Sequence, residues 1–429
     1  MAAMVSPAEE PPVLTLSQAI QIALDNNRPV AIAKLDILKS KWQVAQTKSK
    51  RFPEINTYLF ASGNLTSPSF SFPAGILETI GGSPNPAKNV NVPLSKGITG
   101  FASVQVAQPL SQLYQIHLAI RLQELSTDFA GAQYQGKRQS LAADVKQAYY
   151  ATLQTESSLE ATQALVKQYE ETDRVASQYL AQESVLKSDS LQVKAQLKQQ
   201  QFQIIQLRDT LDTQKEHLNE LLARDIDIPF RTEQVPGITE LEMDLKLARQ
   251  TALAQRPEVK GAEIDVNRAN YDRRLSKAKY IPDVGAAIHY TDPINTEILP
   301  QNILSAGMEF KWNPFDWGGR RDEVQQKDVS LKQSHYQLDE TKAQVLLDVD
   351  NNFRKLQESR SLLEVAQAAR DAANEKMREV NNQFKQSAVL MRDVLQQQAA
   401  VANAEHDYEQ SLLSFWNAKA AFEKSLGEE

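Results

Sequence analysis

The sequence predicts a mixed α and β protein that is mostly helical, internally duplicated and equipped with four short strands. Three observations predict this fold. The composition, with only 15 Gly in 429 residues, 24% charged residues and a mean hydropathy of −0.45, is typical of long helices with polar faces. One pattern of elements occurs in both halves of the chain. Four segments of alternating side chains, each bordered by proline, interrupt the helical pattern.

Composition also excludes several classes of protein. Net charge is −7 and no block of Lys or Arg occurs, so nucleic-acid binding is not expected. The absence of Cys excludes disulfides, thiolate metal sites, Cys nucleophiles and a lipid-modified N-terminal Cys. The five His are scattered without a pair at i and i+4, so neither a metal site nor a cofactor is expected. No phosphate-binding glycine loop is present, and nothing indicates an enzyme.

The N-terminal segment, residues 1–13, is expected to be a disordered tail, because it lacks the apolar stretch of a signal peptide. If the protein is exported, the signal peptide is absent from this version. No run of eighteen apolar residues occurs, so no membrane-spanning helix is expected.

The duplication is clearest in two short stretches, "SVLKSDSLQ" at 184–192 and "AVLMRDVLQ" at 388–396, which place Asp189 and Asp393 204 residues apart. The same separation relates Val145 to Val349, Tyr149 to Phe353, and Leu222 to Leu426. The two halves also begin alike, with "LTLSQAIQIALDNNRP" and "MDLKLARQTALAQRP". We therefore expect two structural repeats, 14–228 and 243–429, joined by a linker at 229–242.

Each repeat is expected to contain a helix, two strands, a very long helix, a tight turn that we call the tip, and a returning helix. The expected strands are 55–63 and 98–108 in the first repeat, and 284–291 and 303–312 in the second. The expected tips are 182–187 and 386–390.

Seven-residue spacing marks the long helices. In the second repeat, one mostly large row pairs with one mostly small row, which suits knobs-into-holes packing of close helices. The large row is Val349, Leu356, Leu363, Arg370, Met377 and Phe384, and the small row is Val345, Asn352, Ser359, Ala366, Ala373 and Val380. Roughly 65 helical residues would extend about 100 Å. The polar positions Thr152, Asp173, Asn352 and Arg370 either set the helix register or face water inside a hollow assembly.

The four strands have the length of tilted membrane strands. In the last one, Met308, Phe310 and Trp312 point to one face while Gly307, Glu309 and Lys311 point to the other. Two interpretations stay open: a small sheet on a helical protein, or a barrel wall with lipid on one side and water on the other. The connection 66–96, rich in Pro, Gly, Ser and Asn, is expected to be exposed and mobile. The corresponding connection in the second half, 292–302, is shorter.

Taken together, these features resemble the TolC-like outer-membrane efflux proteins (outer membrane factors). The resemblance is most specific in "NPFDWGGRR" at 313–321 and "VLMRDVLQQQ" at 389–398. It implies a homotrimer whose four strands per subunit close a transmembrane β-barrel in the outer membrane of a Gram-negative-type cell, with a helical α-barrel in the periplasm. It further implies a passive exit duct of a tripartite efflux pump or type I secretion system.

The partners implied are a periplasmic adaptor (membrane fusion) protein, an inner-membrane transporter of RND or ABC type, and outer-membrane lipid. The alternative is a coiled-coil scaffold protein with a small β-domain and no pore.

In this family the strand–helix corners lie at the membrane edge. The corner residues here are Pro53, Pro109, Pro282, Pro314, Gly318 and Gly319. Pro314 has no N–H and would end strand pairing, and the glycines allow unusual backbone angles. Trp312 and Trp317 are expected at the membrane interface, with core packing as the alternative for Trp317. Arg320 and Arg321 either contact lipid headgroups or are solvated helix charges.

The resemblance also assigns roles to the tips. The residues expected to contact the adaptor are Glu183, Ser184, Val185, Leu186, Ser387, Ala388, Val389 and Leu390. Asp393, with Gln396 and Asp189, is expected at the periplasmic entrance, where three copies of Asp393 would form a cation-selecting ring. Gln396 is uncharged and would make a second ring weaker. The alternative for both aspartates is a helix N-terminal charge favoured by the macrodipole. Val389 replaces a latching arginine of the best-known member, so that latch is not expected.

Overall fold

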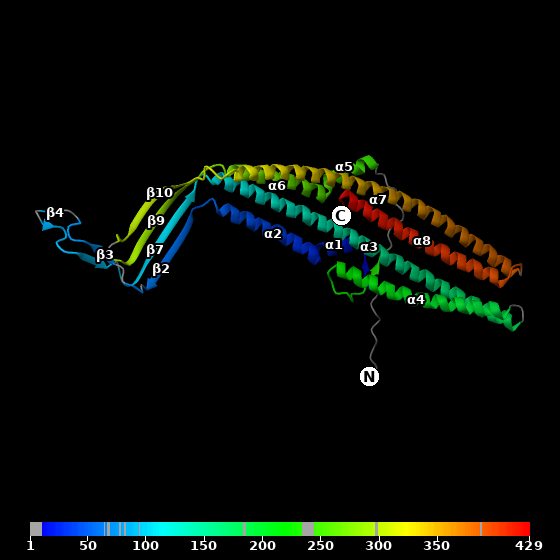
Figure 1. Ribbon diagram of the computed structural model, residues 1–429. Helices are drawn as coiled ribbons and strands as arrows, with labels where there is room; N and C mark the ends of the chain where they lie inside the picture. The colour runs from blue at the N-terminus through cyan, green and yellow to red at the C-terminus, as the bar shows by residue number, and fades with distance from the viewer. Residues whose placement is uncertain are drawn as a thin grey trace, which may run out of the picture. The chain divides into compact units, whose positions relative to one another are not determined.

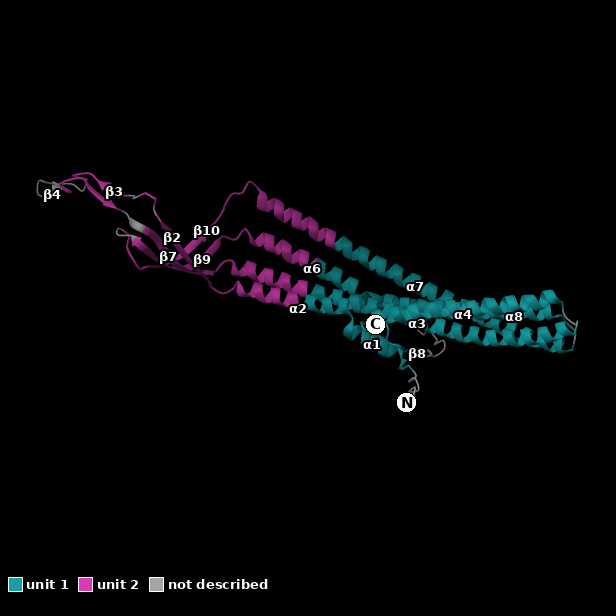
Figure 2. Ribbon diagram, turned by 90° about the horizontal axis from the view of Figure 1, so that it is seen from below, with its two compact units in different colours: residues 1–38, 128–265, 335–429 teal, residues 39–127, 266–334 magenta. Residues whose placement is uncertain are grey.

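A computed structural model describes residues 11–63, 65–66, 69–76, 79–80, 83–93, 95–182, 186–233, 244–296, 299–386 and 388–429. The chain divides into two compact units (Figure 2). Unit 1 comprises Met1–Leu38, Asp128–Asp265 and His335–Glu429, and unit 2 comprises Lys39–Thr127 and Val266–Ser334. Among the described residues, no helix has a stretch both long and apolar enough to span a bilayer.

The order of the main elements is the same in both halves of the chain (Figure 1). The first half contains α1 (Leu16–Asn26), α2 (Arg28–Ser49), β2 (Glu54–Gly63), β7 (Ser95–Pro109), α3 (Leu113–Ala181) and α4 (Lys187–Leu221). The second half contains α5 (Leu245–Gln255), α6 (Pro257–Ala278), β9 (Asp283–Thr296), β10 (Ile303–Lys311), α7 (Gly319–Lys385) and α8 (Met391–Leu426). The two longest helices, α3 and α7, have 69 and 67 residues.

The expected heptad rows of α7 form its buried side within unit 1. Its buried residues are Val345, Val349, Leu356, Ser359, Leu363, Ala366, Met377 and Val380. Three of the polar positions are satisfied within the chain. Thr152 donates to the carbonyl of Ala148 at 2.9 Å, Asn352 donates to the carbonyl of Asp348 at 2.9 Å, and the guanidinium of Arg370 lies 3.9 Å from the centroid of the Tyr408 ring. These contacts favour the alternative in which the three residues set the helix register. Asp173 Oδ1 is buried without a hydrogen-bond partner.

The start of the described chain is ordered. Thr15 caps α1 in a capping box with Gln18. Just before it, β1 (Val13–Leu14) pairs in parallel with β8 (Arg231–Thr232). The buried Tyr149 hydroxyl donates to the carbonyl of Leu14 at 2.8 Å. The expected tail is therefore wrong for 11–13, and residues 1–10 lie outside the described residues. Within the expected linker 229–242, Phe230 is buried and Arg231–Thr232 form β8, and 234–242 lie outside the described residues.

The helices α3 and α8, from different halves of the chain, pack along one line in unit 1 that we call the α3–α8 seam. The rings of Tyr150 and Trp416 stack with centroids 5.3 Å apart. Nearby, Lys146 Nζ lies 2.7 Å from a carboxylate oxygen of Glu423, and the lysine side chain is only 10% exposed. Closer to the tips, Gln398 of α8 donates to the Thr172 hydroxyl at 3.2 Å.

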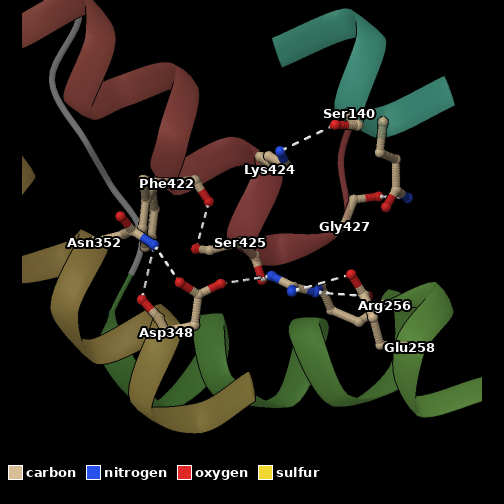
Figure 3. A network of polar contacts seen from close by, with 10 residues as sticks. Ser140, Arg256, Glu258, Asp348, Asn352, Phe422, Lys424, Ser425 and Gly427 are labelled. Atoms are coloured by element: carbon tan, nitrogen blue, oxygen red, sulfur yellow. Dashed lines mark hydrogen bonds and ion pairs between the residues drawn. The ribbon is translucent and has the colours of Figure 1, made fainter. Parts of the chain in front are cut away.

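A polar network fixes the junction of α5 and α6 against α7 and α8 (Figure 3). Arg256 ends α5 and its guanidinium lies 2.8 Å from Asp348 of α7 and 3.0 Å from Glu258 of α6. It also donates to the carbonyl of Ser425 of α8 at 3.3 Å. In the first half, Asn27 ends α1 and donates to the carbonyl of Leu221 at 3.1 Å. In each half, the residue that ends the first short helix thus holds the end of the last helix: Asn27 holds α4 and Arg256 holds α8.

Unit 2 contains a four-stranded antiparallel sheet in the order β10–β9–β7–β2. All four expected strands are present. β9 extends to Thr296, beyond the expected end at 291, because its last residues pair with the first part of β7. The connection 66–96, which is expected to be exposed and mobile, contains an antiparallel pair, β3 (Ser69–Phe72) with β6 (Val90–Pro93), and a second pair, β4 (Thr79–Ile80) with β5 (Ser83–Pro84). The alternating "SFSF" at 69–72 was the signal for β3.

Candidate functional site: a two-faced sheet and two helical tips

The register of the sheet places apolar side chains on one face. Residues that pair across neighbouring strands point to the same side, so cross-strand rows define each face. One row contains Ile55, Val106, Ile288 and Ala306, and the next row on this face contains Thr57, Val104, Tyr290 and Leu304. Met308 and Phe310 continue the same face and are 72% and 63% exposed. This apolar face therefore leaves large hydrophobic side chains uncovered within the chain.

The opposite face of the sheet is polar except at one end. Its central row contains Asn56, Gln105, His289 and Ser305, and the next row toward the helices contains Glu54, Ala107, Ala287 and Gly307. At that end a cavity of about 940 Å³ is lined by charged groups that include Glu54, Asp283, Glu309 and Lys311. At the other end of this face, the rings of Tyr58 and Phe60 contact Phe101. A sheet with one apolar and one polar face suits a wall between hydrocarbon and water.

The corner between β10 and α7 is built around Asp316. Its Oδ2 accepts hydrogen bonds from the backbone N–H of Arg320 at 2.8 Å and from the Arg320 side chain at 2.9 Å, and its Oδ1 accepts from the Gly318 N–H at 3.2 Å. The hydrogen bond from the Arg320 guanidinium lowers the pKa of Asp316. Trp317 and Gly318 have positive φ of 56° and 93°. Gly319 is simply the first residue of α7, so only one of the two glycines uses the left-handed region.

The exposure and contacts of the side chains at this corner bear on the alternatives given for Trp317 and Arg320. Trp317 is 89% exposed, so core packing is wrong for this residue, and Trp312 is 54% exposed. Arg320 is held by Asp316 and lies over the ring of Tyr280, 5.4 Å from its centroid. It is therefore neither a free headgroup ligand nor a solvated charge, whereas Arg321 is exposed. The four corner prolines lie at strand–helix junctions: Pro53 before β2, Pro109 at the end of β7, Pro282 before β9 and Pro314 after β10.

The two tips lie at the ends of the α3–α4 and α7–α8 hairpins in unit 1. Leu186 and Leu390, the residues before α4 and α8, are 69% and 57% exposed. Behind them lies a buried apolar cluster: Tyr169, Ala176, Val193, Met377, Val380, Met391, Val394 and Leu395. Ala388 is exposed, and Val389 packs against this cluster. The expected contact residues Glu183, Ser184, Val185 and Ser387 lie outside the described residues.

The aspartates after the tips differ from each other. Asp393 Oδ2 accepts a hydrogen bond from the backbone N–H of Leu390 at 2.9 Å, at the start of α8. Asp189 instead accepts a longer bond of 3.4 Å from the hydroxyl of Ser188, and no side chain caps α4. Gln396, one turn after Asp393, is exposed. The hydrogen bond gives Asp393 a helix-capping role that its repeat partner lacks.

The chain is similar to known outer-membrane proteins in sequence and in fold. The family model described as outer membrane efflux protein matches residues 19–224 and 248–428 of the chain. The chain belongs to the outer membrane efflux protein family. The resemblance read from the strand–helix corner and the second tip is confirmed by this match.

Relatives of this outer membrane efflux protein are distant in sequence. The alkaline protease secretion protein AprF of Pseudomonas aeruginosa is 20% identical over 296 residues, 67% of this chain, and the match spans 61% of the length of AprF. Among solved structures, CusC aligns with a TM-score of 0.81 at 14% identity, covering 96% of this chain and 92% of CusC. The MtrE outer membrane channel of Neisseria gonorrhoeae, solved in its open state, aligns with a TM-score of 0.76 at 16% identity, covering 96% and 89%. These structures share the fold of the efflux protein described here.

Two features of the efflux protein were not predicted from its sequence. The Asp316 cap depends on a side chain that folds back onto the following turn, although its Asp-x-Gly spacing is a recognisable turn signal. The Arg256 network joins four helices, and no local pattern indicates which distant carboxylate the arginine meets.

Proposed function

We propose that this protein is a homotrimeric outer-membrane channel-tunnel that serves as the passive exit duct of an efflux pump or type I secretion system. The observation that carries the proposal is the sheet: one face is apolar and exposed, the other is polar, and its edge strands are β2 and β10. These edges have similar lengths, 10 and 9 residues. If β2 of each copy pairs with β10 of the next, three copies close a barrel of about twelve strands with lipid outside and water inside.

The α3–α8 seam suggests how the helices of neighbouring copies meet. Under the proposed duplication, Tyr150 of α3 corresponds to Arg354 of α7, and Trp416 of α8 corresponds to Asp212 of α4, each 204 residues away. Arg354 and Asp212 are exposed and oppositely charged. Tyr150 and Trp416 stack within one chain. The equivalent α7–α4 contact is then made between copies, with Arg354 facing Asp212 of the neighbouring copy.

Exposed apolar side chains on the same two helices support this interface. Leu362 and Val365 of α7, at 51% and 65% exposure, correspond by the same separation to Ser158 and Ala161, which face α8 across the seam. On α4, Phe202 and Ile205 are 58% and 54% exposed. Apolar side chains gathered on facing helices are typical of a surface that another subunit covers.

A cross-linking experiment tests the trimer. The chain has no Cys, so the double variant Arg354→Cys, Asp212→Cys introduces the only thiols. Oxidation of the detergent-purified protein should give species of two and three chains on a non-reducing gel. The single variants Arg354→Cys and Asp212→Cys are the matched controls: each lacks the partner thiol across the interface and should stay at monomer mass. A double variant that also stays at monomer mass after oxidation would contradict the trimer.

At the other end of the proposed duct, the tips offer exposed Leu186 and Leu390 to the adaptor, and Asp393 lines the entrance with Asp189 and Gln396 nearby. The name of AprF, a secretion protein, supports a place beside an inner-membrane transporter. Reconstitution into planar bilayers tests the duct: we expect discrete conductance steps that depend on the trimer. A well-folded protein that stays monodisperse without detergent and never conducts would favour the scaffold alternative.

A further inference from the structure

The α3–α8 seam opens into a cleft of about 820 Å³ between α3, α4 and α8, all within unit 1. Amide and hydroxyl side chains form most of its polar lining, and Gln154, Gln168, Gln203 and Gln214 are among them. Among the described lining residues, only Glu405, His406 and Glu409 carry titratable groups, and all three lie on α8. The cleft is therefore polar but contains no permanent positive charge of its own.

Glu409 is poorly satisfied in this cleft. Its Oε2 is buried without a hydrogen-bond partner, and so is Oε1 of Gln214 across the cleft. Arg370, a basic group on α7, lies over the Tyr408 ring and has its Nη1 3.8 Å from Glu405. Burial raises the pKa of Glu409 to about 7, repulsion from Glu405 adds to this rise, and Arg370 opposes it. Glu156 of α3 and Lys215 of α4 form an ion pair with each other, with Nζ and Oε1 2.7 Å apart, so their charges compensate one another.

Another acid in the same seam has the opposite environment. Glu423 lies 2.7 Å from Lys146, so its charge is compensated where α3 and α8 meet. On α4, the residue that corresponds to Glu409 by the 204-residue separation is the apolar Ile205. The α3–α8 seam within the chain therefore has an uncompensated acid, Glu409, and the equivalent position on α4 has none.

We propose that Glu409 is a proton-responsive element of the α3–α8 seam, which packs closely when Glu409 is protonated and loosens when it is ionised. A protonated carboxyl can donate to an amide or hydroxyl oxygen of the cleft lining, in which Oε1 of Gln214 also lacks a partner. An ionised carboxylate cannot donate, and its charge is costly to bury without a partner. The packed seam binds the proton more tightly than a solvated glutamate does, so its stability falls as pH rises from the ordinary range of a glutamate, about 4.3, through neutrality.

Spin-label distances across the seam test this inference directly. Glu160 of α3 and Asp407 of α8 are exposed and do not line the cleft. Nitroxides at Glu160→Cys and Asp407→Cys in the full-length purified protein report the separation of the two helices. Between pH 5.5 and pH 8.5, we expect the distance distribution to broaden toward longer values, with a midpoint near the pKa of about 7 for Glu409.

Three variants distinguish the role of Glu409 in the pH response from the roles of Glu405 and His406. Glu409→Gln should keep the narrow, short distribution at both pH values, because an amide cannot ionise. Glu405→Gln should move the midpoint to lower pH by removing a repelling charge. His406→Asn should keep the response, because this substitution leaves the carboxyl group of Glu409 in place. A pH response that survives in Glu409→Gln, disappears in His406→Asn, or is absent from the unmodified sequence would overturn the inference. The distances are measured without transport, so they do not depend on the proposed duct.

Discussion

The carboxylate of Asp393 caps the backbone N–H of Leu390 at 2.9 Å. This contact ties a residue expected at the periplasmic entrance to the stability of the helix that begins there. Two substitutions separate the two roles. Asn retains an oxygen that accepts the hydrogen bond but removes the charge, whereas Ala removes both.

We expect Asp393→Ala to lower the free energy of unfolding by about 1 kcal/mol, and Asp393→Asn to change it much less. If Asp393 also forms the entrance ring, both variants weaken cation preference in planar bilayers. Asp189→Ala is the matched control, because no side chain caps α4. Equal loss of stability in Asp393→Ala and Asp189→Ala would contradict the capping role, and unchanged selectivity in Asp393→Asn would place the filter elsewhere.

The network around Arg256 should contribute more to stability than an exposed ion pair. The Arg256 side chain is 13% exposed and contacts α7 and α8. Arg256→Ala should cost about 1.5–3 kcal/mol, since it removes a largely buried guanidinium that hydrogen-bonds to two carboxylates and to the carbonyl of Ser425. Arg249→Ala removes a pair with Asp350 in which the arginine is 45% exposed, so it should cost much less than Arg256→Ala. Urea denaturation in detergent measures both, and similar values would show that the network adds nothing.

The two glycines of the β10–α7 corner should respond differently to alanine. Gly318 has φ of 93°, so Gly318→Ala should cost about 1–2 kcal/mol. Gly319 begins α7, and the nearest atom to an added Cβ is 3.6 Å away, an ordinary contact. Gly319→Ala should therefore be neutral or stabilise by about 0.4–1 kcal/mol. Thermal denaturation of both variants is the measurement, and a tolerated Gly318→Ala would mean that the corner does not require a left-handed residue.

Acid should weaken the contact between α5 and α7. The hydrogen bond from Arg249 lowers the pKa of Asp350. A carboxyl with a lowered folded-state pKa stabilises the fold above its unfolded pKa of about 3.9, and this stabilisation is lost as pH falls through the lower folded value. In Asp350→Asn, the melting temperature should therefore decrease less between pH 5 and pH 3 than in the unmodified sequence. The exposed Asp36 supplies a control substitution, which should leave the acid slope unchanged.

Features of this structure that depend on residues close together in the sequence could be predicted, whereas features that depend on contacts between distant residues could not. The row Val349, Leu356 and Leu363 was predictable because heptad spacing decides which side of a helix is buried, and all three are buried. The strands were predictable from alternation. The environment of Glu409 was not, because it depends on the positions of three helices far apart in sequence. The pairing of Val13 with Arg231 was likewise too short to leave a pattern.

The edge strands β2 and β10 have a consequence for how copies assemble. An unpaired edge is a template for any other strand. In the proposed trimer, a dimer still has two free edges, and only the third copy removes both at once. The closing step thus gains two strand pairings where the first step gains one. Assembly should therefore be cooperative, with monomer and trimer populated and the dimer scarce, and its yield should depend steeply on chain concentration.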